Sequence, residues 1–221
     1  MIQPNFDAAT HAYPPWHCEG EAFVLNYWLS PSFLKHLAHF GLKQAHLGRV
    51  IHLLLIRYQH TPVGPYDALV IIDHPFLGKQ RCSSIPFSLV SSLDSVEYGH
   101  YFWGIPKQYA EFSWKFQDEK ICCNIHYKGE SLVLMLDKHK HAASSSLDSQ
   151  QLSQTILNVH QDWQQQHYKF QPKFSARLCK LKHIVWQQPS PSFLPDFQKS
   201  RLLPSFYLPE FRLTLPSAIQ S

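Results

Sequence analysis

Residues 111–136 read EFSWKFQDEKICCNIHYKGESLVLML and contain three strand patterns in direct succession. Residues 111–116, 120–127 and 131–136 are rich in the aromatic, β-branched and other large apolar side chains that favour a pleated strand. Turn-forming residues separate the three patterns, and Lys128-Gly129 has the composition of a short hairpin turn. The stretch therefore predicts strands that pair in an antiparallel sheet.

The same kind of pattern recurs toward the N-terminus. Further strands are predicted at residues 21–28, 46–58, 66–73 and 85–90. Strands that recur at a spacing of roughly eight to twelve residues are typical of a closed or sandwiched antiparallel sheet. We therefore expect one mainly β (α+β) domain over residues 1–221.

Two segments carry a helical pattern instead. Residues 30–41 begin with Ser30-Pro31, a cap and first-turn pair, and end at a glycine. Residues 149–167 place large side chains at steps of three and four. We expect two or three helices beside the sheet.

The C-terminal segment 189–221 combines many prolines with large apolar side chains. Proline breaks regular structure into short extended pieces, whereas a disordered tail would not need so many aromatic and aliphatic groups. We interpret residues 189–221 as an extended arm that wraps the domain or a partner subunit.

Composition excludes several classes of protein. The chain has 221 residues, 44% of them hydrophobic, which argues against disorder, and a formal net charge of +4, which is small for a nucleic-acid binder. No apolar run approaches the roughly 20 residues of a spanning helix, and the N-terminus lacks a signal-peptide pattern. Five cysteines without a CxxC motif suggest neither a disulfide scaffold nor a zinc site. We expect a cytoplasmic protein that contacts neither membrane nor nucleic acid.

Chemistry is indicated in residues 97–114, EYGHYFWGIPKQYAEFSW, where Lys107 stands among aromatic and aliphatic residues. A lysine kept from water loses protons more readily, and the neutral amine can attack a carbonyl carbon to form a Schiff base. The alternative is a lysine whose stem lies on apolar surface while its amine reaches water. Both interpretations stay open at this point. Glu97 is interpreted as a charge facing solvent.

Four motifs together resemble the acetoacetate decarboxylase-like superfamily. They are Tyr13-Pro14-Pro15-Trp16 with Gly20, then Gly64-Pro65-Tyr66-Asp67, then Gly99 with Trp103-Gly104-Ile105-Pro106-Lys107, Ala110 and Phe112, and finally 211–216, FRLTLP. The resemblance implies an antiparallel β-barrel or cone with a buried pocket, in a homo-oligomer without a cofactor. It also implies that Lys107 is the residue that forms the Schiff base.

Three positions depart from the family pattern. Gln108 stands where the decarboxylases have a second lysine, so burial alone would have to lower the pKa of Lys107. Ala68 stands where a glutamate is usual, and Asp67 beside it would face the opposite side of a strand unless a bulge intervened. His100 replaces an arginine that follows the first glycine of the lysine motif in similar relatives.

These departures indicate a changed substrate or a lost activity. The predicted site comprises Lys107 as the catalytic residue, with substrate-binding candidates Tyr66, Asp67, Ala68, His100, Trp103 and Gln108. A neutral pocket lined by aromatic groups suits a small keto acid or a less charged carbonyl compound. The competing hypothesis is a non-catalytic barrel that binds an apolar ligand. The pairs His36/His39 and His139/His141 lack a third ligand, so no metal site is expected.

Overall fold

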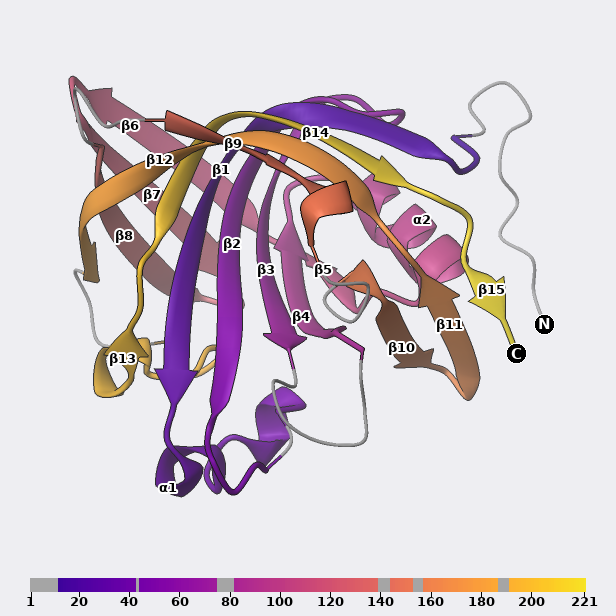
Figure 1. The fold of residues 1–221 in the computed structure, drawn as a ribbon, viewed down its shortest axis with the longest axis horizontal. Coiled ribbons are helices and arrows are strands. Elements are labelled where there is room, and N and C mark those ends of the chain that lie inside the picture. Colours follow the sequence, from indigo (N-terminus) through magenta and orange to yellow (C-terminus); the bar gives the residue numbers. More distant parts are fainter. Residues whose placement is uncertain (1–11, 43, 75–81, 139–143, 153–156, 187–190) are drawn as a thin grey trace.

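The computed structural model describes residues 12–42, 44–74, 82–138, 144–152, 157–186 and 191–221 (Figure 1). Its helices and strands are, in chain order, β1 (Trp16–Leu29), α1 (Pro31–Leu34), β2 (Arg49–His60), β3 (Tyr66–His74), β4 (Ser84–Val90), α2 (Leu93–Trp103), β5 (Lys107–Tyr109), β6 (Glu111–Gln117), β7 (Lys120–Tyr127), β8 (Glu130–Lys138), β9 (Ser144–Asp148), β10 (Val159–Trp163), β11 (Gln166–Phe170), β12 (Lys173–Trp186), β13 (Arg201–Leu202), β14 (Phe206–Leu215) and β15 (Ile219–Gln220). Short 3₁₀ turns lie at Ala38–Phe40, Ser149–Gln151 and Phe197–Lys199.

Most strands belong to one large sheet. Its strand order is β5-β4-β3-β2-β1-β14-β12-β8-β7-β6, with β13 paired to β1 and β9 paired to β12, while β10, β11 and β15 form a small second sheet (Figure 1). The pairing is antiparallel except between β4 and β5, which run parallel. The mainly β class predicted from the sequence is confirmed, as a mixed rather than a purely antiparallel sheet.

The main core follows the two-residue period of the strands. In β7 the residues at every second position, Ile121, Cys123, Ile125 and Tyr127, are buried. They pack with apolar side chains of β1, β2, β3 and β8 in one cluster, and Phe23 of β1 stacks on Trp114 of β6 with ring centroids 6.4 Å apart. The two halves of the sheet therefore fold over and face each other across this core.

The sheet does not close into a barrel. The path of paired strands ends at β5 on one side and β6 on the other, and no ladder among the described residues joins these two strands. The predicted barrel or cone is therefore not confirmed. Of the helices within the described ranges, none combines the length and the apolar content that crossing a membrane requires.

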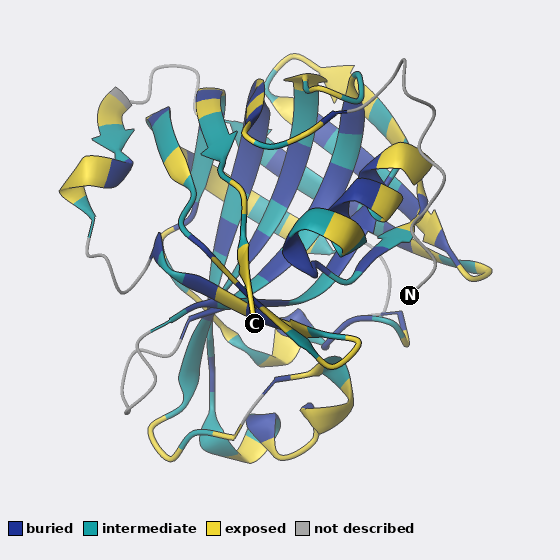
Figure 2. Ribbon diagram, turned by 90° about the vertical axis from the view of Figure 1, so that its right-hand side faces the viewer, coloured by how far each residue is buried: buried dark blue, intermediate teal, exposed yellow. Residues whose placement is uncertain are grey.

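A helical crossover explains the parallel pair. Two adjacent parallel strands cannot be joined by a tight turn, so the chain between β4 and β5 must cross over one face of the sheet. It does so as α2, whose Ser92 side chain accepts a hydrogen bond from Ser95 N and whose end is marked by Gly104 at φ 60°. Figure 2 shows α2 lying on the sheet with its buried face inward. The sequence analysis placed no helix here.

The helix predicted at residues 149–167 is wrong for the described residues 149–151 and 159–167. Residues 149–151 form a 3₁₀ turn, residues 153–156 lie outside the described residues, and β10 and β11 pair as a hairpin. The buried Gln161 accepts a hydrogen bond from Ile85 N at 2.7 Å and donates one to Ile85 O at 2.8 Å. Contact with β4 thus outweighs the local helical pattern.

The predicted helix at residues 30–41 is present in two pieces. Ser30 caps α1, the 3₁₀ turn at Ala38–Phe40 follows, and Gly41 ends the segment at φ 74°. In the C-terminal segment, β14 pairs with β1 on one side and β12 on the other. This segment therefore supplies an interior strand of the large sheet, since β14 lies between two neighbours.

Candidate functional site

Lys107 is the first residue of β5, and its side chain is buried at 6% relative exposure. Its Nζ donates a hydrogen bond to Ser95 Oγ over 2.8 Å. The same nitrogen lies 5.7 Å from the ring centroid of Trp16 and 5.6 Å from that of Tyr66, within the range of cation–π attraction. The amine is therefore held in one place by a hydroxyl and two aromatic faces.

The aliphatic part of the Lys107 side chain packs against helix α2. A Cβ atom added at Gly99 would approach Lys107 Cδ to 2.5 Å, so only glycine leaves room for the stem. Ser95 lies four residues before Gly99, which places both on one face of the helix, one turn apart. The methylene groups of Lys107 pass over Gly99, and the amine at their end bonds to Ser95, one helical turn away.

Burial changes the proton affinity of the groups around the amine. Removal from water lowers the pKa of Lys107 to about 8, with a smaller opposing effect from the nearby Cys18. Burial raises the pKa of the Cys18 thiol to about 11 and raises the pKa values of the Tyr58 and Tyr66 phenols. At neutral pH these three groups keep their protons, while about one Lys107 amine in ten is uncharged.

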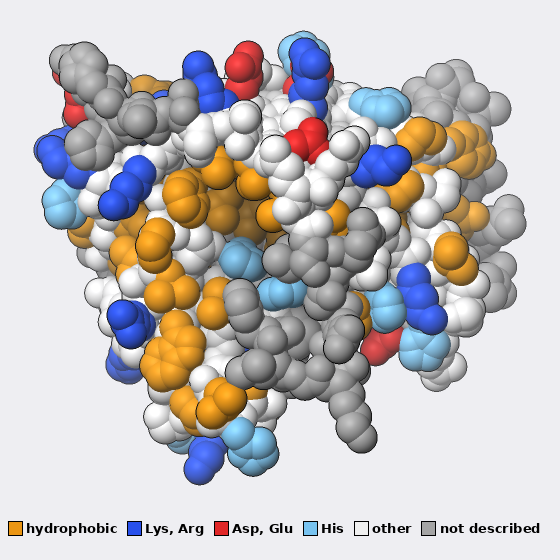
Figure 3. Space-filling view, in the orientation of Figure 1, with side chains coloured by type: hydrophobic (Ala, Val, Ile, Leu, Met, Phe, Trp, Pro, Cys, Tyr) orange, Lys and Arg blue, Asp and Glu red, His pale blue; other side chains and the backbone are white. Residues whose placement is uncertain are grey.

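The surroundings of the amine continue into an apolar surface. Tyr66, Ala68 and Val90 belong to a cluster of apolar residues that also includes partly buried side chains of β1, β2, β12 and β14. Figure 3 shows hydrophobic side chains gathered around a hollow on the face of the molecule that presents β1 and β2. The aromatic end of this cluster is Tyr66, whose ring packs against Tyr58 at 4.7 Å.

The structure separates Asp67 from the lysine. Strands β2 and β3 pair without a register shift from Tyr58↔Tyr66 to Val50↔His74, so no bulge turns Asp67 toward the face of Tyr66. Ala68 shares that face and is buried beside Tyr66. Asp67 lies on the other face, where its Oδ1 is 3.9 Å from Arg57 Nε.

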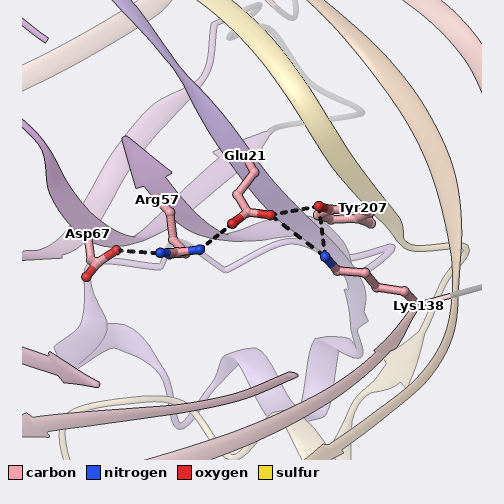
Figure 4. A network of polar contacts seen from close by, with 5 residues as sticks. All are labelled: Glu21, Arg57, Asp67, Lys138 and Tyr207. Atoms are coloured by element: carbon pink, nitrogen blue, oxygen red, sulfur yellow. Dashed lines mark hydrogen bonds and ion pairs between the residues drawn. The ribbon is translucent and has the colours of Figure 1, made fainter. Parts of the chain in front are cut away.

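Asp67 there belongs to a chain of polar contacts (Figure 4). Arg57 Nη1 donates to Glu21 Oε1 at 2.5 Å, and Tyr207 donates to Glu21 Oε2 at 2.7 Å. Lys138 Nζ donates to Tyr207 Oη at 2.9 Å and lies 3.9 Å from Glu21. Glu21, at 8% exposure, is the carboxylate that holds both cations.

The candidates His100 and Trp103 contact other groups than the Lys107 amine. The His100 ring stacks on Trp163 at 4.5 Å and its Nε2 bonds the backbone carbonyl of Lys107 at 2.8 Å, away from the amine. Burial lowers the pKa of His100, which favours the neutral imidazole. Trp103 is fully buried, contacts Trp16 edge-on at 5.0 Å, and donates to Pro216 O at 2.7 Å. Trp103 thus supports Trp16 from behind.

Gln108 lies on the face of β5 opposite to Lys107, because consecutive residues of a strand alternate. It accepts a hydrogen bond from the Tyr127 hydroxyl in β7. The residue at position 108 therefore has no direct contact with the lysine amine, whatever its charge.

This arrangement gives a test of position 108. Substitution Gln108→Lys is expected to lower the pKa of Lys107 by less than about one unit, since the new ammonium would lie on the opposite face of the strand. The pKa is read from the pH dependence of imine formation at Lys107. A decrease by a unit or more would mean that the two lysines share one environment.

Sequence reasoning missed Ser95 and Cys18 as neighbours of the amine. Trp16 and Cys18 are two residues apart in β1 and therefore lie on the same face of the strand. The Tyr-Pro-Pro-Trp motif ends at Trp16, so an extension of the strand pattern by two residues would have pointed to Cys18. Ser95 could have been found from its spacing of four residues to Gly99, had residues 93–103 been predicted as a helix. Within the described residues, no three His, Cys, Asp or Glu side chains gather as a metal-binding group, and His139 and His141 lie outside those residues.

Comparisons with solved structures find the same fold in other proteins. The structure of acetoacetate decarboxylase from Legionella pneumophila superposes with a TM-score of 0.71 at 13% identity, over 100% of this chain and 92% of that one. The enduracididine biosynthesis enzyme MppR, complexed with the condensation product of pyruvate and imidazole 4-carboxaldehyde, gives a TM-score of 0.65 at 11% identity, over 99% and 94%. An acetoacetate decarboxylase-like enzyme from Sphingomonas wittichii RW1 gives 0.65 at 13% identity, over 98% and 97%.

At such low identity these superpositions establish a shared fold. No curated protein matches the chain by sequence. The model of the acetoacetate decarboxylase family, in contrast, matches residues 1–190, which include Lys107 and every side chain described around its amine. The chain therefore belongs to the acetoacetate decarboxylase family.

Proposed function

We propose that this protein is a lyase-type enzyme that acts on a small carbonyl compound through a Schiff base at Lys107. The observation that carries the proposal is the position of the Lys107 amine, which is buried, bonded to Ser95 at 2.8 Å and shifted to a pKa of about 8. A lysine with these properties supplies enough neutral amine to attack a carbonyl at physiological pH.

The chemistry follows from the amine. Its lone pair adds to the carbonyl carbon, water leaves, and a protonated imine results, which withdraws electrons from the neighbouring carbon. In a β-keto acid the bond to the carboxylate carbon breaks, its electrons move into the imine, CO₂ leaves, and the enamine is then protonated. The faces of Trp16 and Tyr66, 5.7 and 5.6 Å from the nitrogen, stabilise the positive charge of the imine.

The apolar side chains near the amine bear on the polarity of the substrate. The apolar cluster that ends at Tyr66 offers a dry surface for the carbon skeleton of a small substrate. Its Ala68 presents a methyl group rather than a carboxylate. The alternative of a non-catalytic barrel that binds an apolar ligand is not favoured, because burial of an amine is costly and an apolar ligand makes no use of it.

Borohydride trapping tests the proposal. The protein is incubated with acetoacetate, with pyruvate and with acetone, each mixture is reduced, and the modified residue is identified by peptide mass. We expect one adduct, on Lys107, whose rate of formation rises with pH, because the neutral amine is the nucleophile, and levels off above a midpoint near pH 8.

The matched control is Lys107→Arg, which keeps a long cationic side chain but cannot form an imine. This variant should give no adduct at position 107. Absence of an adduct on the unmodified protein with all three carbonyl compounds, or a midpoint near that of a free lysine at about 10.4, would refute the proposed function.

A further inference from the structure

Ser95 is the hydrogen-bond acceptor of the Lys107 amine, yet its role in the fold does not require that bond. Its backbone N–H is already satisfied by the Ser92 side chain at the start of α2. The Ser95 side chain is completely buried and lies 2.8 Å from Nζ. An alanine would suit the helix at least as well, so the hydroxyl calls for a chemical explanation.

Formation of the imine needs a proton donor at this place. When a neutral amine and a carbonyl give a protonated imine, the amine keeps one of its two protons, so the oxygen needs one further proton to leave as water. The carboxylates of Asp67 and Glu21 lie on the opposite face of the sheet. Beside Nζ the described residues offer the Ser95 hydroxyl, the Tyr66 phenol and the Cys18 thiol.

Ser95 also lies near one of these acids. The Ser95 side chain opposes the effect of burial on the pKa of the Tyr66 phenol. Tyr66 is buried at 7% exposure, and its ring faces Nζ at 5.6 Å. Ser95 and Tyr66 therefore both flank the Lys107 amine, and Tyr58 packs on the Tyr66 ring at 4.7 Å.

We propose that Ser95 passes a proton between the Tyr66 hydroxyl and the oxygen atom of the substrate during formation and hydrolysis of the imine on Lys107. The inference rests on the proposed function and names the acid for it. Ser95 contacts the reacting nitrogen and acts as a catalytic residue, whereas Tyr66 acts through Ser95.

The step balances as follows. The Nζ lone pair forms the N–C bond, the carbonyl electrons move to oxygen, and one proton of the amine reaches that oxygen by way of the Ser95 hydroxyl. The C–O bond then breaks as Ser95 gives its proton to the oxygen and takes the Tyr66 proton in turn. Water leaves, and the iminium ion and tyrosinate remain as a neutral pair. Hydrolysis reverses each transfer and returns the proton to Tyr66.

The test compares Ser95→Ala with the unmodified protein by single-turnover borohydride trapping of acetone from pH 6 to 10. We expect the rate on the plateau above pH 9 to fall about 100-fold, the scale of a lost general acid. A purely structural or electrostatic role predicts otherwise. Loss of the hydroxyl would then destabilise the ammonium form, shift the midpoint to lower pH and leave the plateau unchanged.

Tyr66→Phe provides a second variant that keeps the aromatic face. Its plateau rate should also fall, and the double variant should be no slower than Ser95→Ala alone, because both substitutions interrupt one path. Unchanged plateau rates in either single variant, or additive losses in the double variant, would overturn the inference. If the unmodified protein gives no adduct at all, the proposed function itself fails, so the two failures are distinguishable.

Discussion

Substitution of Gly99 by alanine is expected to slow imine formation at Lys107 about 100-fold while the protein remains folded. The new methyl group would lie 2.5 Å from Lys107 Cδ and 2.9 Å from Cε, closer than any real contact. The aliphatic part of the Lys107 side chain must then move away from α2, and the amine moves away from Ser95. A displacement of about 1 Å at a reacting group commonly costs a factor of this size.

The helix itself should accept the change. Gly99 lies inside α2, where alanine is favoured over glycine by about 1 kcal/mol. The rate of borohydride trapping and the melting temperature are therefore measured together. Glu97→Ala is the matched control, since Glu97 is exposed on the same helix, and it should leave both values unchanged. A Gly99→Ala protein that reacts within twofold of the original rate would show that the stem does not depend on this glycine.

Substitution Glu21→Gln is expected to destabilise the fold by about 1–3 kcal/mol, less than the loss of a fully buried ion pair because the Arg57 and Lys138 side chains are 35% and 25% exposed. Glu21 is 8% exposed, and its two carboxylate oxygens hold Arg57 at 2.5 Å and Tyr207 at 2.7 Å, with Lys138 at 3.9 Å. A neutral amide removes the negative charge beside Lys138 and leaves Arg57 with Asp67 alone, at 3.9 Å (Figure 4). Chemical denaturation measures the loss as a lower midpoint.

The same strand offers a control for this effect. Glu19 pairs with Arg212 at 3.3 Å, but the two side chains are 51% and 81% exposed. Solvent screens such a pair, so Glu19→Gln should cost at most about 1 kcal/mol. Equal losses for the two variants would mean that the buried network of Glu21 contributes no more than a surface ion pair.

Alternation along strands accounts for much of what could be predicted from the sequence. The two-residue period located β3 and β7 within a residue at each end, and the same period implied that Asp67 and Ala68 face opposite sides. The aromatic surroundings of Lys107 indicated a dry amine, and its 6% exposure agrees. These features depend on local order in the chain, which the sequence contains directly.

Other features depend on partners distant in the chain. Residues 159–167 carry a helical spacing, yet they form strands because Gln161 bonds to Ile85 in β4. Residues 93–103 form a helix because β4 and β5 pair in parallel and need a crossover, and that pairing cannot be read from residues 93–103 themselves. The proline-rich C-terminal segment likewise supplies β14 between β1 and β12.

The sequence by itself indicated strands β1 to β4 and β6 to β8, the aromatic setting of Lys107 and the family to which its motifs are similar. Only the tertiary structure decided which groups touch the amine: Ser95 beside it, Gln108 and Asp67 turned to the other face, and His100 bonded to the backbone. The physical reason is that a side chain's direction is set by local backbone geometry, whereas its neighbours are set by which strands and helices pack together.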